Sequence, residues 1–125
     1  MAVHYDPKIT PDPGLWLALG EQERVAAILA WHEANEAPHP PTPRPTLHAA
    51  MHAVAETQAA ANDPPEVRRT LERLRGGGLD RHSAIHAVAS VVGDTMAATL
   101  AAGGEFDAEA YAAALKKLNP GDWRF

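Results

Sequence analysis

The chain has 125 residues, near the commonest size of a single domain, and 46% of them are hydrophobic. We therefore expect one helical domain over residues 1–125. The formal net charge of −5 argues against a broad positive surface, so we expect no nucleic-acid partner. Cysteine is absent, which removes disulfides, thiolate metal sites and cysteine nucleophiles together.

The first residues lack the basic start and apolar core of a signal peptide. No segment approaches the roughly 20-residue apolar run expected of a membrane span. We therefore expect a cytoplasmic protein with no membrane partner.

The N-terminal third alternates between Pro-rich and helical stretches. Residues 1–20 are Pro-rich, and Leu15–Leu19 should form a short turn or helix that lies over the core. Apolar periodicity predicts a helix over 21–35. Residues 37–45 contain five prolines and no periodicity, which is typical of an extended connector.

Two helices should follow this connector. Thr46 is typical of an N-cap, and its helix should run to about Ala61. Pro64 suits the first position of the next helix, which the three glycines Gly76–Gly78 should end.

The last third predicts two further helices. Asp80 should cap a long helix reaching about Ala102, and Asp107 should cap a last one that ends at Asn119-Pro120. Two aromatic residues could anchor the tail: Trp123 and Phe125. The fold class is therefore all-α, a bundle of about five helices.

A nine-residue segment occurs nearly twice. His48–Glu56 returns 34 positions later as His82–Ser90. Each copy carries two histidines at i and i+4, which a helix places on one face. Short loops should make neighbouring helices antiparallel, so the two histidine-bearing helices should run parallel with both pairs at one height. We interpret this as an internally duplicated helix hairpin.

The histidines should lie at the border of the apolar face on each helix. The earlier helix should centre its apolar stripe on Leu47, Met51 and Val54. The later helix should centre its stripe on Ile85, Val88, Val92 and Met96. Alanine or glycine beside the histidines would leave room for imidazoles to meet, a position that suits metal ligation.

This pattern predicts a metal centre for a divalent transition metal: zinc, iron or nickel. The candidate ligands are His48, His52, His82, His86, Glu56 and His32. Glu56 could be a direct ligand, or it could accept a hydrogen bond from a ring nitrogen, as could Asp94. Arg81 could bridge to a carboxylate.

Other interpretations stay open. The imidazoles could hydrogen-bond at helix junctions without metal, or act in a pH-responsive domain. The chain could also be a metal-free interaction or homodimerisation module using alanine-rich faces. The pattern argues against a zinc metallopeptidase, because Ala49 and Ser83 stand where glutamate would follow the first histidine. No residue discloses a reaction or a substrate.

Several blocks resemble a bacterial family, domain of unknown function 1841. They are Leu47–His52 with Glu56 and Gln58, Gly78–His82 with Ala84–Ala87, and upstream Trp16–Leu19 with Trp31-His32. The resemblance implies an α-helical domain with histidine-bearing helices and no established activity. It marks His32, His48, His52, Glu56, Gln58, Arg81, His82 and His86. Where relatives should carry Ala-Glu-His, this chain has Gly93-Asp94-Thr95, so Thr95 loses a ligand role and Asp94 would replace the glutamate.

Overall fold

The computed structural model describes residues 4–35 and 44–123. In these ranges the chain forms helices and no strand, so the all-α prediction is confirmed. The helices are α1 (Pro13–Ala18), α2 (Glu21–Ala34), α3 (Pro45–Ala61), α4 (Pro65–Gly76), α5 (Arg81–Ala102) and α6 (Ala108–Lys116), followed by a 3-10 turn, η1 (Pro120–Asp122). The described ranges thus hold six α-helices rather than about five, because Leu15–Leu19 falls mostly in a true helix.

The predicted caps of the last two helices are confirmed. The Asp80 carboxylate accepts a hydrogen bond from the Ser83 amide at 2.7 Å, and Asp107 accepts one from the Ala110 amide at 3.0 Å. Each bond satisfies one amide that the helix cannot pair internally. Gly103 closes α5 with a φ of 65°, which glycine adopts without steric cost.

The starts of two helices differ from the prediction by one or two residues. Arg44 rather than Thr46 is the N-cap of α3, and Pro45 is its first residue. Pro64 caps α4, and Pro65 takes the first helical position. In both cases proline is tolerated in the first turn because its missing amide would have no partner there. The connector predicted over 37–45 lies mostly outside the described residues.

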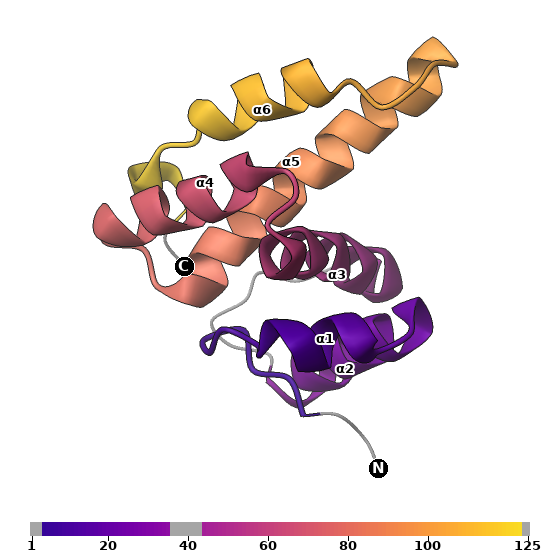
Figure 1. The fold of residues 1–125 in the computed structure, drawn as a ribbon, viewed down its shortest axis with the longest axis vertical. Coiled ribbons are helices and arrows are strands. Elements are labelled where there is room, and N and C mark those ends of the chain that lie inside the picture. Colours follow the sequence, from indigo (N-terminus) through magenta and orange to yellow (C-terminus); the bar gives the residue numbers. More distant parts are fainter. Residues whose placement is uncertain (1–3, 36–43, 124–125) are drawn as a thin grey trace.

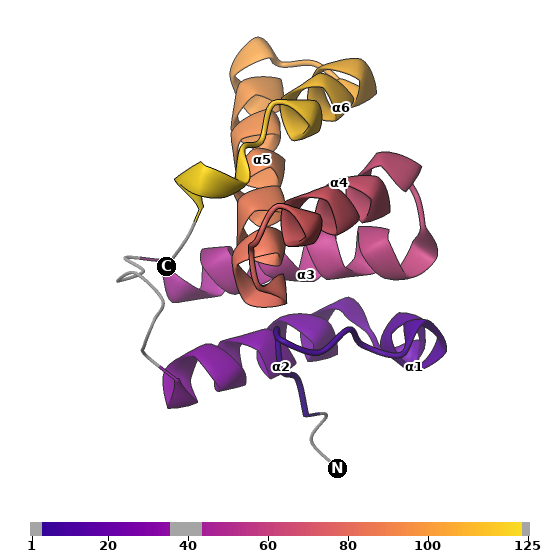
Figure 2. The ribbon, with the colours of Figure 1, turned by 90° about the vertical axis from the view of Figure 1, so that its left-hand side faces the viewer.

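Helix α3 lies in the middle of the molecule (Figures 1 and 2). Helices α1 and α2 lie on one side of it, and α4, α5 and α6 on the other. In Figure 2, α5 crosses α3 instead of running beside it, so the expected parallel arrangement was wrong. The histidine pairs therefore meet at a helix crossing, where α5 packs against α3 along its length up to about Gly93. The duplicated hairpin stays a prediction from the sequence.

Because α3 lies between two apolar clusters, its buried face differs from the predicted stripe. Leu47 is 50% exposed, whereas His52 and Glu56 are 0% and 1% exposed. The alanines of α3 contact both neighbouring layers, and the polar side chains occupy the centre of the helix packing. On α5 the predicted stripe is buried as expected up to Val92, whereas Met96 is 40% exposed.

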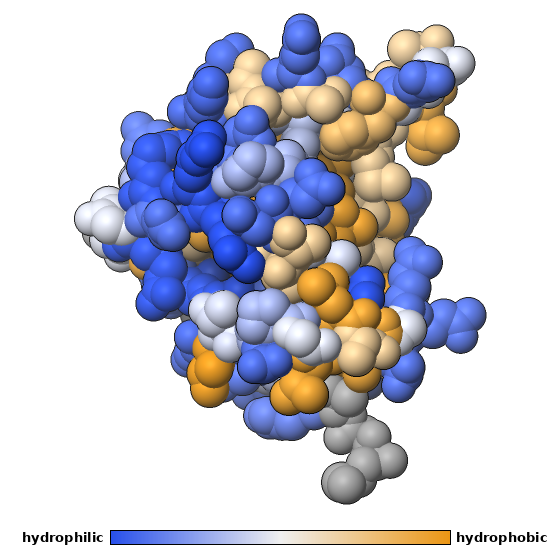
Figure 3. Space-filling view, viewed as in Figure 1, coloured by the Kyte–Doolittle hydropathy of each residue, from blue (hydrophilic) through white to orange (hydrophobic). Residues whose placement is uncertain are grey.

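Helix α5 is long and apolar enough, by length and composition alone, to cross a membrane. The expectation that no segment has this character was therefore wrong. A core helix rich in alanine and valine passes the same test, and residues 81–92 of α5 are all buried or half-buried in the domain. On the surface, Figure 3 shows a hydrophilic face over α4 and hydrophobic side chains gathered over α1, where Leu15 is 73% exposed.

Candidate metal centre

Three helices bring five of the seven histidines together. This histidine cluster consists of His32 from α2, His48 and His52 from α3, and His82 and His86 from α5. The ring centroids of His48 and His52 are 4.3 Å apart, and those of His52 and His82 are 6.2 Å apart. All five predicted histidine positions thus lie in one place. His4 is exposed, and His39 lies outside the described residues.

The ring nitrogens are close enough to share an ion. One potential ligand nitrogen from each of His32, His48 and His52 lies within 4.8 Å of the other two. His52 Nε2 and His86 Nδ1 are 3.3 Å apart. Two ligands of a tetrahedral zinc ion, each about 2.0–2.1 Å from the metal, are separated by roughly 3.3–3.4 Å. The His52–His86 separation is that of a hydrogen bond between two rings, and it also equals one edge of a coordination tetrahedron.

The cluster has a dry side and an accessible side. His52 is 0% exposed and His82 is 1% exposed, whereas His48 and His86 are half-buried. Trp31, itself half-buried, packs against the cluster, since its ring lies edge-on to His82 at 4.9 Å and to His32 at 5.0 Å. An ion at this place would be shielded by protein from one direction and reachable from the other.

The surroundings of His52 keep its imidazole neutral. Burial lowers the pKa of His52 well below its ordinary value of 6.5, and repulsion from His48, His86 and the other neighbours lowers this pKa further. Metal ions bind the neutral form of histidine, because the ring nitrogen must offer a lone pair. His52 is therefore ready to act as a ligand at neutral pH.

A backbone contact fixes the tautomer of His32. Its Nδ1 lies 2.9 Å from the carbonyl oxygen of Ile28, one turn earlier in α2. A carbonyl oxygen only accepts hydrogen bonds, so Nδ1 must carry the proton. The neutral ring then has its lone pair on Nε2. Contacts of this kind orient many metal-binding histidines.

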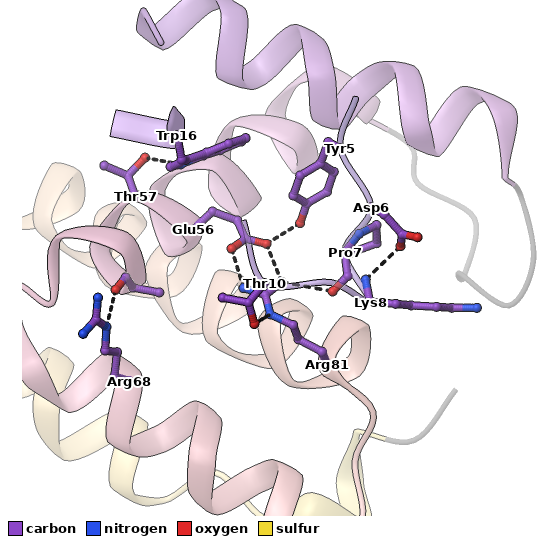
Figure 4. A network of polar contacts seen from close by, with 11 residues as sticks. Tyr5, Asp6, Pro7, Lys8, Thr10, Trp16, Glu56, Thr57, Arg68 and Arg81 are labelled. Carbon is purple, nitrogen blue, oxygen red and sulfur yellow. Dashed lines mark hydrogen bonds and ion pairs between the residues drawn. The ribbon is translucent and has the colours of Figure 1, made fainter. Parts of the chain in front are cut away.

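A buried ion pair lies one helical turn from His52 (Figure 4). Arg81 donates to the two oxygens of Glu56 at 2.6 and 2.8 Å, and the phenol of Tyr5 also donates to Oε2 of Glu56. Arg81 further donates to the Pro7 carbonyl and to the Thr10 hydroxyl, each at 3.0 Å. Burial raises the pKa of Tyr5 well above its ordinary value, and the charge of Glu56 raises this pKa further. The phenol therefore stays protonated and keeps donating.

This network changes the role of Glu56. Both carboxylate oxygens contact Arg81, so binding a metal through Glu56 would require breaking a buried ion pair. The sequence pointed to a carboxylate partner for Arg81, but it did not identify Glu56 as that partner, and it missed Tyr5 entirely. Asp94, the other expected acceptor, is exposed on α5.

Fold and cluster together define an all-α protein with an imidazole-rich centre at a helix crossing. The family model described as "Domain of unknown function (DUF1841)" matches residues 23–117, which include the whole histidine cluster. The chain belongs to this family, and the resemblance seen in the sequence is confirmed. Comparisons with curated proteins and with solved structures found no match.

Proposed function

We propose that this protein binds a divalent transition-metal ion (zinc, iron or nickel) at the histidine cluster. The observation that carries the proposal is the convergence of ring nitrogens: three within 4.8 Å of one another, and His52 and His86 at 3.3 Å. Imidazole donors favour this class of metal over magnesium and calcium, which prefer oxygen ligands.

The charges around the cluster support a metal more than a set of hydrogen-bonded histidines. Five imidazoles whose neighbouring rings lie at centroid distances of 4.3–6.2 Å cannot all be protonated without strong mutual repulsion. Kept neutral, they form a dense set of nitrogen donors at the centre of the helix packing. A bound cation gives such a set of donors a common electrostatic partner.

We assign the ligand roles from position. His52 and His86 form the central pair, with His32 and His48 as the next ligands, and His82 lies on the dry side as a further ligand or an orienting neighbour. Glu56 acts through Arg81, because their ion pair joins α3, which carries His52, to the start of α5, which carries His82. In this proposal Glu56 holds the two helices in register and does not bind the ion.

Elemental analysis of untagged protein tests the proposal. The wild type should carry close to one equivalent of metal, and His52→Ala/His86→Ala should carry less than about 0.1 equivalent. His4→Ala is the matched control, because His4 is exposed and outside the cluster. Wild-type protein without metal, and without a thermal shift on adding zinc, iron or nickel, would reject metal binding.

A second role, in homodimerisation, has one favouring observation. Leu100 is 80% exposed and Phe106 is 43% exposed near the C-terminal end of α5. Exposed apolar side chains of this kind are found where surfaces associate. Sedimentation should then give a dimer that becomes a monomer in Leu100→Glu/Phe106→Glu. A monomeric wild type would reject this role.

A further inference from the structure

The accessible side of the histidine cluster opens into a pocket between α3 and α5. The pocket has a volume of about 290 Å³, and His48 and His86 form part of its wall. Leu47 and Met51 contribute an apolar side, and Arg44 contributes a positive charge. Its volume is close to the lower end of the range for small-molecule pockets.

The charge of the centre decides which molecules fit this pocket. Imidazole ligands are neutral, so a divalent ion held by them keeps its full positive charge. The nearby carboxylate of Glu56 does not offset that charge, because Arg81 pairs with it. Arg44 adds a further positive charge to the pocket wall. The region therefore attracts an anion.

We propose that the pocket binds a small monocarboxylate with a short apolar chain, whose carboxylate binds the metal ion beside its histidine ligands. This inference rests on the proposed metal binding. The chain lies against Leu47 and Met51, while Arg44 attracts the anion to the site. His48 and His86 are placed for this role, because each belongs both to the cluster and to the pocket wall.

Gly93 offers a way to close the pocket without touching a proposed ligand. It lines the pocket, and a Cβ added there would meet only Met51, at an ordinary contact distance of 3.8 Å. Gly93→Leu should therefore be tolerated by the backbone while its side chain fills the space. Gly76→Leu is the matched control, since a Cβ at Gly76 meets nothing within 4 Å and lies outside the pocket.

The test uses the full chain loaded with cobalt, whose visible absorption reports changes in coordination. Acetate and butyrate are titrated separately, with azide as the inorganic anion. Butyrate should bind about tenfold more tightly than acetate, because two additional methylenes are buried. Arg44→Gln should weaken butyrate binding about threefold to tenfold. Gly93→Leu should abolish the butyrate response and keep cobalt, and Gly76→Leu should behave as wild type.

The outcomes separate the two proposals. If the protein binds cobalt but its absorption does not change with carboxylates, the proposed pocket ligand is wrong and the proposed metal centre is unaffected. The same holds if the change is equal for acetate and butyrate and is unaltered in Gly93→Leu. A response to azide alone would also overturn the proposed pocket ligand, in favour of an inorganic anion. Failure of the wild type to bind cobalt, zinc, iron or nickel would overturn both. If Gly93→Leu does not bind cobalt, butyrate binding is compared instead between the wild type and Gly93→Ala, which has a smaller side chain.

Discussion

Replacing Arg81 by methionine should strongly destabilise the domain. The substitution keeps most of the side-chain length but removes four hydrogen bonds, two to Glu56 and one each to Pro7 and Thr10. The side chain of Glu56 is 0% exposed, so its carboxylate would remain away from water with Tyr5 as a donor. An uncompensated buried charge is among the costliest defects a single substitution can create.

The size of the effect follows from this burial. Breaking a buried ion pair by removing one partner costs about 3–5 kcal/mol. Domains of this size have a free energy of unfolding of about 5–15 kcal/mol, so Arg81→Met removes a large part of the total. We expect the melting temperature to fall by roughly 10–20 °C.

Urea denaturation followed by circular dichroism measures the effect, with Arg81→Met/Glu56→Leu as the second variant. The double variant removes both charges, and it should recover about 2 kcal/mol relative to Arg81→Met. If the free energy of unfolding of Arg81→Met falls by less than about 1 kcal/mol, water reaches the ion pair of Arg81 and Glu56. A double variant no more stable than the single one would contradict the electrostatic argument.

Three further predictions concern pH, packing and capping. Because burial holds the pKa of His52 well below 6.5, the unfolded chain gains a proton that the folded chain does not. The free energy of unfolding of metal-free protein should therefore fall as pH drops below about 6.5, by up to about 1.4 kcal/mol per pH unit, and His52→Gln should flatten this slope in urea titrations. Gly77→Ala would place a Cβ 2.5 Å from Pro120 Cγ, so thermal melts should show that the free energy of unfolding falls by about 1–3 kcal/mol. Gly76→Ala is the control: its Cβ would meet nothing within 4 Å, so this variant should be as stable as the wild type or more stable. Asp80→Ala removes the cap of α5 and should cost about 0.5–2 kcal/mol, and an unchanged melting temperature would argue against the cap.

The local features of the fold were readable in the sequence because they depend on neighbouring residues. Asp80 and Asp107 cap the helices that follow them, and the glycines after residue 75 end α4. The repeated histidine spacing predicted a shared site because i and i+4 positions lie on one face of any helix. Each of these inferences needs only a turn or two of chain.

The remaining features depend on which helices become neighbours. Helix α3 is enclosed from two sides, so alanines, His52 and Glu56 line its buried face while Leu47 stays exposed. No apolar periodicity can indicate that arrangement. The partnership of Glu56 with Tyr5 joins positions 51 residues apart, a distance over which sequence spacing carries no information.

The opening segment of the chain bears on where this domain can be cut. The family signature starts at residue 23, yet Tyr5 and Trp16 are 4% and 3% exposed, and Pro7 and Thr10 accept hydrogen bonds from Arg81. A recombinant fragment limited to residues 23–117 would lack the two groups that accept hydrogen bonds from Arg81. It would also lack Tyr5, whose phenol donates to Glu56. The stretch that the family model matches is therefore shorter than the stretch whose side chains pack and hydrogen-bond together.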